Sequence, residues 1–294
     1  MSESQKRIHV VINPAAGKDE PILNVINDLF KQYKVKWSVS VTQDAGEATE
    51  FARAAAEDGF DIVAGYGGDG TQHEIANGLL GTDAVMGVLP GGTGNNFSKE
   101  LGTPQTLRPA VELLCTGNRV RNVDVVQMNE ECFILRLLVG IEPETETTRE
   151  EKDKFGKLAY LWESIRNTRD LQELQYRITI DGEYIEAPGM ALYVVNAAKN
   201  DAGISFLGKF SSIDDGLLDA FILNRNDFKT FTSLADRMLN LDTQKARDYV
   251  RHGKEMIIET DPDQPVWMDG EYSGRTPIYL KVLPAALPVV VPEK

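Results

Sequence analysis

The sequence has little of the residue chemistry that marks disulfide, zinc or redox proteins. It contains two cysteines and three histidines in 294 residues. No CxxC pair and no cluster of Cys and His occurs, whereas a disulfide framework or a zinc site needs such a pattern. Neither kind of protein is indicated, and a reducing cytoplasm is the expected compartment.

Long apolar runs are also missing. The best candidate, CFILRLLVG, is interrupted by Arg136, and the apolar run near the N-terminus is too short for a signal peptide. A membrane-spanning helix needs about 20 apolar residues, and no segment comes near that length. We therefore expect a soluble, cytoplasmic protein whose contact with membranes, where it occurs, is peripheral.

Positive charge is scarce as well. The chain has 31 Lys and Arg against 45 Asp and Glu, which gives a net charge of −14 at pH 7. Nucleic-acid-binding domains carry a basic face, so this balance argues against a nucleic-acid partner. It argues equally against simple electrostatic adhesion to anionic lipid.

Two different sequence patterns follow one another along the chain. Up to about residue 125, strand and helix patterns alternate, which is typical of βαβ units; beyond it, strand-like runs separated by Asp-Gly turns predict a β-sandwich. We thus expect a Rossmann-like α/β domain over 1–125 and a β-sandwich domain over 126–294, with the option that the last strand returns to the first domain. In the first domain the patterns predict strands at 7–12, 35–41, 61–65 and 84–90, and helices at 21–33, 46–59 and 72–81. In the second, helical patterns at 155–171 and 227–241 interrupt the strands.

Three glycine-containing loops each follow a predicted strand and precede a predicted helix. They are NPAAGK (13–18), GYGGDGT (65–71) and PGGTGNN (90–96). In a parallel sheet such loops emerge at the carboxyl edge, where ligands bind. Helix N-termini there offer free N–H groups to anions, and glycine lets a ligand approach the backbone closely. Three such loops on one edge predict a nucleotide or phosphate site.

The best-known glycine motifs do not fit. The Walker pattern GxxxxGK[ST] is absent. Gly65-x-Gly67-x-x-Gly70 matches the dinucleotide pattern GxGxxG, but that fingerprint also wants an acidic residue at the end of the next strand. The next predicted strand ends at Leu89-Pro90, so a dinucleotide-binding dehydrogenase is not supported.

Asp69 stands in the middle of the second loop, where a like charge would repel phosphate. Three explanations remain open from the residues alone. The carboxylate holds Mg²⁺ against a polyphosphate, directly or through water; it binds a sugar hydroxyl; or it caps the following helix, a position that Asp favours.

Several motifs in order resemble one known family, the diacylglycerol/sphingosine lipid-kinase catalytic domain. They are INPAAGK, GGDGT with Glu74 three residues later, and LPGGTGNNF; in the second half, FGKLAYL, DDGLLDAFIL and MDGEYSG are similar to the bacterial soluble members. The resemblance implies an α/β domain followed by a β-sandwich, with ATP and a lipid meeting in the cleft between them. NAD kinases share a GGDGT loop, but the motifs of the second half favour the lipid kinases.

The resemblance also implies site residues. Nucleotide contacts fall on Asn13, Pro14, Ala15, Ala16, Gly17, Thr42, Gly67, Gly68, Asp69, Gly70, Thr71, Gln72, His73, Glu74 and Thr93. By residue type alone, Thr42 is a strand-end threonine and Thr93 is a candidate N-cap. The family places the general base at Glu271, although Asp269-Gly270 by itself reads as a hairpin turn.

Metal ligands are implied in two places. Asp124 matches an acid that the family uses near Asp69, so the two would share Mg²⁺. A second, structural Mg²⁺ site maps to Asp215 with backbone oxygens of Ser212 and Leu217, and the alternative there is an Asp-Gly turn.

The chain departs from the family at one loop position. The family loop commonly reads Gly-Thr-x-Asn-Asp-Phe, whereas here Asn96 replaces the acid. An amide accepts a hydrogen bond but lacks the negative charge that Mg²⁺ prefers.

The predicted function is an ATP- and Mg²⁺-dependent lipid kinase that phosphorylates a hydroxyl of diacylglycerol or a related lipid at a membrane surface. The alternatives are an NAD kinase-like phosphotransferase and a non-catalytic module that binds nucleotide or lipid. The identity of the lipid and the formation of a homodimer stay open.

Overall fold

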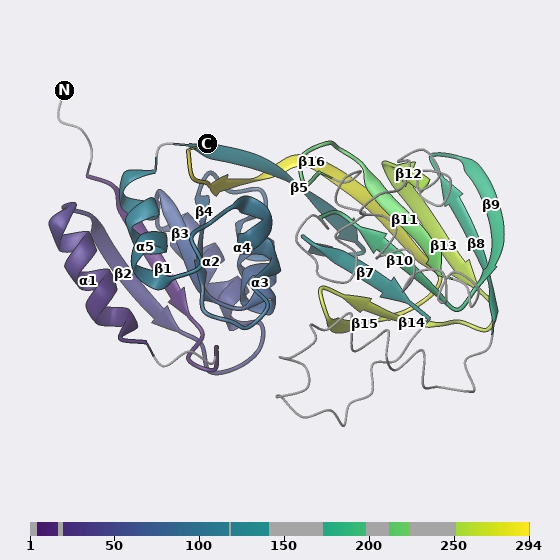
Figure 1. Ribbon diagram of the computed structural model, residues 1–294, viewed down its shortest axis with the longest axis horizontal. Helices are drawn as coiled ribbons and strands as arrows, with labels where there is room; N and C mark the ends of the chain where they lie inside the picture. Colours follow the sequence, from purple (N-terminus) through teal and green to yellow (C-terminus); the bar gives the residue numbers. More distant parts are fainter. Residues whose placement is uncertain are drawn as a thin grey trace, which may run out of the picture. The chain divides into compact units, whose positions relative to one another are not determined.

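The computed structural model describes residues 5–16, 20–117, 119–140, 173–197, 212–223 and 251–293. The chain divides into two compact units (Figure 1): Met1–Val125 with Pro284–Lys294, and Val126–Leu283. The first is a parallel α/β unit and the second an antiparallel β-sandwich, so the predicted fold class is confirmed.

A parallel sheet forms the first unit. Its strands are β1 (Arg7–Ile12), β2 (Lys36–Val41), β3 (Ile62–Gly67) and β4 (Val85–Pro90). They lie side by side in the order β2-β1-β3-β4, and every neighbouring pair is parallel. The end of β16 (Ile278–Val290) also belongs here, because Val289 pairs with Met86 of β4.

Helices pack on both faces of this sheet. They are α1 (Ile22–Gln32), α2 (Glu47–Glu57), α3 (Asp69–Leu79), α4 (Asn96–Leu101) and α5 (Leu107–Thr116). α1 and α5 share a core cluster with alternate residues of β1 and β3, whereas α3 lies so close to the opposite face that a Cβ on Gly65 would be 2.3 Å from Ile75. Cover on both faces explains why β3 is buried at every position.

Apolar and polar residues alternate over 35–41, but the four apolar side chains do not all reach the core. Val35 and Trp37 reach the core cluster, but Val39 and Val41 are exposed. β2 is the edge strand of the sheet, and the pattern alone does not say where a strand lies in the order.

Two antiparallel sheets form the second unit. The strands not yet named are β5 (Val120–Met128), β6 (Glu131–Phe133), β7 (Arg136–Val139), β8 (Leu174–Ile180), β9 (Glu183–Gly189), β10 (Ala191–Val195), β11 (Leu218–Leu223), β12 (Arg251–Gly253), β13 (Glu255–Thr260), β14 (Pro265–Met268) and β15 (Glu271–Arg275). One sheet has the order β12-β11-β10-β7-β14-β15, and the other contains β16-β13-β8-β9 with β5 and β6. One buried cluster takes side chains from both sheets and forms the core of the sandwich.

The strand-like run 131–139 forms two strands, because Ile134 and Leu135 separate β6 from β7. The helices expected at 155–171 and 227–241 lie outside the described residues. Within the described ranges, no helix is both long and apolar enough to cross a membrane.

Candidate functional site

The three glycine-containing connections meet at the carboxyl edge of the parallel sheet. The Asn13 amide N–H donates to the Tyr66 carbonyl at 2.9 Å, and the Gly91 N–H donates to the Gly67 carbonyl at 3.0 Å. The Asn13 side-chain Nδ2 donates to Thr71 Oγ1 at 3.1 Å. Each connection is therefore hydrogen-bonded to the one that contains Asp69.

Two glycines are required here by close approach. A Cβ on Gly67 would lie 2.3 Å from Thr71 Oγ1, and a Cβ on Gly92 would lie 2.5 Å from Gly68 Cα. Heavy atoms that close overlap, so the strand end and the third loop can pack only without side chains. Gly68 and Gly92 therefore meet backbone to backbone at this edge.

The segment GYGGDGT is hardly a loop at all. β3 continues through Gly67 and α3 begins at Asp69, so both elements are longer than predicted and Gly68 alone separates them. The glycines are strand residues here because their lack of side chains admits α3 against the sheet. Asp69 consequently occupies the first turn of a helix, beside its positive dipole end.

The Asp69 carboxylate does not cap its own helix. Oδ1 accepts the Phe97 amide N–H at 3.0 Å, and Oδ2 accepts Asn96 Nδ2 at 3.2 Å. It therefore caps α4 across the site and not the helix that follows it, so the explanation that Asp69 caps α3 is wrong. Asn96, where the resemblance leads one to expect an acid, is the side chain that donates to Asp69.

The third loop is held by a residue that sequence reasoning missed. Asn95 Oδ1 accepts the Gly92 N–H at 3.0 Å, and its Nδ2 donates to the Gly92 carbonyl at 2.6 Å. Asn95 has φ of 50°, a left-handed conformation that Asn tolerates, and it immediately precedes α4. The expectation that Thr93 caps this helix was wrong, since Thr93 is exposed and lies before the cap position.

Three other residues that were predicted to contact nucleotide direct their side chains to backbone groups of the protein. Glu74 Oε2 accepts the Ala48 N–H at 3.1 Å and thereby caps α2. The Thr42 hydroxyl is directed to the Ile12 carbonyl at 3.5 Å. Gln72 is buried, and its Nε2 donates to the Gly65 carbonyl at 2.9 Å, so its side chain faces the sheet interior.

The remaining members of the predicted set lie on the first connection and on α3. The Ala15 N–H donates to Asn13 Oδ1 at 2.9 Å in a tight turn. Pro14 and Ala15 are exposed, whereas Ala16, Gly70 and His73 are half-buried. Gly17 lies outside the described residues.

The described contact of Asp124 is with a neighbouring strand and not with Asp69. It is buried in β5, and its Oδ1 accepts the Ala285 N–H of β16 at 2.7 Å. Ala285 has φ of 53°, so the carboxylate stabilises an irregular point of that strand. Its described partner is thus a neighbouring strand, and a metal shared by Asp124 and Asp69 stays a prediction.

Glu271 follows a tight hairpin turn in the second unit. Asp269 and Gly270 have φ of 48° and 99°, as a two-residue turn between β14 and β15 requires. Glu271, the first residue of β15, is exposed. The turn that Asp269-Gly270 predicts is therefore present, and it presents the glutamate to solvent.

The Asp269 carboxylate is largely buried and accepts three backbone N–H groups. Its oxygens receive those of Ile134, Leu135 and Arg136 at 2.9, 3.1 and 2.8 Å. These donors span the break between β6 and β7, which explains why that run is not one strand. Sequence reasoning missed this role because the three donors are more than 130 residues away.

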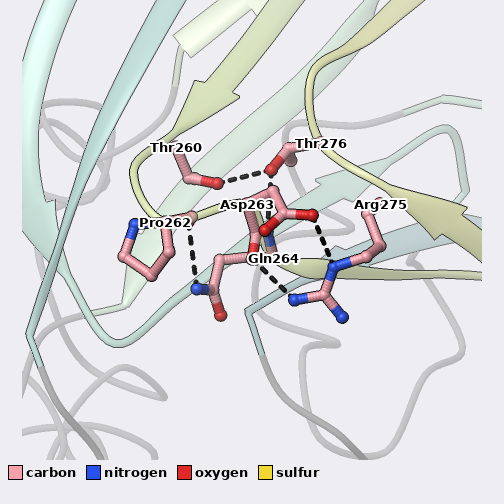
Figure 2. Close-up of polar contacts among 6 residues, drawn as sticks. All are labelled: Thr260, Pro262, Asp263, Gln264, Arg275 and Thr276. Atoms are coloured by element: carbon pink, nitrogen blue, oxygen red, sulfur yellow. Dashed lines mark hydrogen bonds and ion pairs between the residues drawn. The ribbon is translucent and has the colours of Figure 1, made fainter.

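Polar contacts also fix the base of this hairpin (Figure 2). Arg275 Nε and Nη2 donate to Oδ2 and the carbonyl oxygen of Asp263, both at 2.7 Å. The Gln264 N–H donates to Thr276 Oγ1 at 2.9 Å, and the Thr276 N–H returns to the Gln264 carbonyl at 3.0 Å. Glu271 is thus carried by a hairpin held at both ends.

The residues of the predicted structural metal site form a turn, and a metal there stays a prediction. Asp215 Oδ2 and Oδ1 accept the N–H groups of Ser212 and Leu217 at 3.1 and 3.0 Å. The Ser212 carbonyl accepts the Asp215 N–H at 3.2 Å. The alternative of an Asp-Gly turn accounts for these contacts.

Three other reactive side chains have little scope for catalysis. Burial raises the pKa of both Cys115 and Cys132 to about 11, so neither thiol ionises at neutral pH. His9 is buried; its Nδ1 lies 2.6 Å from Ser38 Oγ, and burial lowers its pKa. His9 is therefore a core residue.

Family models match both halves of the chain. The diacylglycerol kinase catalytic domain matches residues 7–128, and the YegS C-terminal NAD kinase beta sandwich-like domain matches residues 138–291. The second match alone covers more than half of the chain.

Relatives match along nearly the whole length. The diacylglycerol kinase of Bacillus subtilis is 28% identical over 299 residues, with 98% of this chain and 97% of that protein covered. The diacylglycerol kinase of Staphylococcus carnosus is 27% identical over 298 residues, with 98% and 96% covered. A crystal structure of a diacylglycerol kinase from Bacillus anthracis superposes with a TM-score of 0.85 at 28% identity and covers 99% of both chains. The chain therefore belongs to the bacterial lipid kinase family that joins a diacylglycerol kinase catalytic domain to a YegS-type β-sandwich.

Proposed function

We propose that this chain is an ATP-dependent lipid kinase that transfers the γ-phosphoryl group to a hydroxyl of diacylglycerol or a related lipid. The observation that supports this most is the convergence of three glycine-containing connections at one sheet edge, in a chain that belongs to this family. The lipid is drawn from a membrane surface that the protein touches transiently.

The nucleotide binds at the carboxyl edge of the first unit. The backbone is partly exposed there at Gly68 and Gly92, which lack side chains, and the N-termini of α1 and α3 direct positive dipole ends to the same edge. Phosphoryl transfer needs positioning and charge neutralisation more than covalent chemistry, and this edge supplies both.

Mg²⁺ fits the residues at this edge. Mg²⁺ in kinases is held by one or two carboxylates together with phosphate oxygens and water, so a dedicated cluster of acids is not needed. Asp69 is half-buried at the edge, and each of its oxygens accepts one described hydrogen bond, which leaves further lone pairs. When bound, the ion neutralises phosphate charge.

Glu271 is the general base in this proposal. An acceptor hydroxyl needs a proton acceptor as it attacks, and an exposed carboxylate on a fixed hairpin can take that proton at an Oε atom. Asp269 acts differently, since its oxygens are engaged by backbone N–H groups and it positions the hairpin.

A transfer assay separates this proposal from its alternatives. ATP labelled at the γ-phosphate is offered with MgCl₂ and either mixed micelles of dioleoylglycerol or NAD. Label in the lipid supports the proposal. Label in NAD supports the NAD kinase alternative, and nucleotide binding without label in either would establish a non-catalytic module.

A further inference from the structure

A row of exposed side chains crosses the sheet that contains β16, β13, β8 and β9. Tyr279 pairs with Ile257, Ile257 with Thr179, and Thr179 with Tyr184. Directly opposed residues of antiparallel strands place their side chains on the same face. The exposed fractions are 43% for Tyr279, 42% for Ile257 and 57% for Tyr184. We call these four residues the exposed row.

The exposed row lies on the outer face of its sheet. The sandwich core takes the alternating neighbours Leu280, Ile258 and Ile178 from the same strands, and none of the row members. Single exposed apolar side chains are ordinary on protein surfaces, whereas neighbouring ones rimmed by polar residues are typical of an interaction surface. Three of the large apolar side chains that are exposed in the described ranges stand together here. The exposed row therefore calls for a partner.

A charged row runs beside the exposed row, two residues along three of the same strands. Glu259 pairs with Arg177, and Arg177 with Glu186. Although Glu259 and Arg177 are directly opposed, neither forms an ion pair within the described part of the chain. Both charges act on the Tyr184 hydroxyl, so the charged row borders the exposed row. Glu259 and Arg177 are therefore available to charges on another molecule.

The exposed row is complementary to itself. A half-turn about an axis that lies parallel to the strands, between β13 and β8, brings β16 of one copy opposite β9 of another and β13 opposite β8. Tyr279 then meets Tyr184, and Ile257 meets Thr179. An interface of this symmetry uses the same patch on both copies and makes each contact twice. Sheets pack face to face in this manner about 10 Å apart.

The charges select this axis and this kind of partner. The same half-turn sets Glu259 of one copy opposite Arg177 of the other, and opposite charges across an interface fix its register. A half-turn about the exposed row itself would set Glu259 against Glu255, which lies on the other side of Ile257, and two acids repel. Acids on both sides of the row also disfavour an anionic membrane as the occupant.

We propose that this face binds a second copy of the chain and forms a twofold homodimer, with the exposed rows packed on each other and Glu259 paired with Arg177 across the interface. The inference does not depend on the proposed function. Four strands about 4.8 Å apart, over about 20 Å of their length, offer about 400 Å² of flat face on each copy. Interfaces of about that size are at the small end of specific ones, so we expect a reversible dimer that forms at micromolar concentrations.

Charge exchange between copies tests the paired charges directly. Arg177→Glu alone sets acid against acid across the interface, and Glu259→Arg alone sets base against base. In sedimentation velocity we expect each variant to have a dimer dissociation constant at least about tenfold above that of the parent protein. An equimolar mixture of the two variants restores both opposite-charge contacts between copies, although neither copy regains its own cross-strand pair, and it recovers dimers. A mixture that stays monomeric would overturn the proposed contact.

A second variant tests the exposed row. Ile257→Glu places a charge at its centre and abolishes the dimer, with Tm unchanged because the side chain is exposed. Val120→Glu, which alters an apolar side chain of similar exposure (47%) on β5, is the matched control and leaves the dimer intact. A parent protein that is monomeric at about 100 µM, or a dimer that survives Ile257→Glu, contradicts the proposal. So does binding of the monomer to phosphatidylcholine vesicles that Ile257→Glu abolishes, since the face would then serve a membrane.

Discussion

The sequence Asp-Gly-Glu-Tyr occurs twice in the β-sandwich, at 181–184 and at 269–272, and both copies form the same hairpin. The turn residues Asp181 and Gly182 have φ of 49° and 89°, close to those of the second copy. Each glutamate is the exposed first residue of the returning strand. Each aspartate also accepts backbone N–H groups from a neighbouring strand.

The two copies differ in their surroundings. Asp181 is exposed and accepts the N–H groups of Lys254 and Glu255, whereas Asp269 has an exposed fraction of 6% and accepts three. Tyr184 donates to Glu186, but Tyr272 packs edge to face on Trp267. A local motif therefore specifies a turn, and its neighbours decide what the turn is used for.

The largest expected effect separates the two glutamates. Glu271→Gln removes the proposed base and lowers phosphoryl transfer to lipid by about 10²- to 10⁴-fold, with ATP affinity and the unfolding midpoint unchanged because the side chain is exposed. Glu183→Gln makes the same chemical change in the same turn and leaves the rate as it was. Initial rates of label transfer measure both variants. Equal rates for the two variants would show that Glu271 is not the general base.

The next effect separates the two aspartates by stability. Asp269→Ala leaves buried N–H groups unsatisfied, and we expect a loss of about 3 kcal/mol or more in the free energy of unfolding. Asp181→Ala costs a small fraction of that, since water replaces an exposed carboxylate. Urea unfolding followed by circular dichroism gives both values. A loss for Asp181→Ala as large as that for Asp269→Ala would show that burial is not what distinguishes the copies.

The smallest expected effect concerns Asp69, a third aspartate whose carboxylate accepts a backbone N–H group. Asn96→Asp replaces a donor 3.2 Å from Asp69 Oδ2 with a second carboxylate. Like charges that close repel, so in EDTA we expect Tm to fall by about 2–4 °C. MgCl₂ restores Tm if the site takes the ion between the two acids.

Asn96→Ala is the control for this change, because it removes the donor without adding charge and gives no response to MgCl₂. Thermal unfolding with and without the ion measures all three proteins. An Asn96→Asp protein whose Tm ignores MgCl₂ would argue against Mg²⁺ at Asp69.

The fold was predictable wherever local pattern and burial agree. Alternating strand and helix patterns placed β1, α1 and α2 within a residue or two, because short buried strands and amphipathic helices carry their periodicity with them. The pattern failed where tertiary contacts decide. Gly65 and Gly67 belong to a strand because α3 packs on them, and the break between β6 and β7 is fixed by Asp269 from a distant turn.

The site was predictable to the level of the segment and less so to the side chain. Glycine-containing connections after parallel strands do meet at one edge, as topology requires. The orientation of a side chain depends on what surrounds it, so Gln72 faces inward, Glu74 caps α2, and Asn95 holds the loop. The register of the strands in the six-stranded sheet joins distant parts of the chain, and one sequence does not specify that register.

The return of β16 to the first unit orders events during synthesis. Val289 pairs with Met86, Val290 joins the core cluster of the first unit, and the Arg119 guanidinium donates to the Pro292 carbonyl at 3.3 Å. A ribosome makes the α/β half first, but that half lacks one strand until residue 290 has left the exit tunnel. Until then the outer edge of β4 stays open to wrong pairing, and the whole sandwich must be translated before the first unit closes.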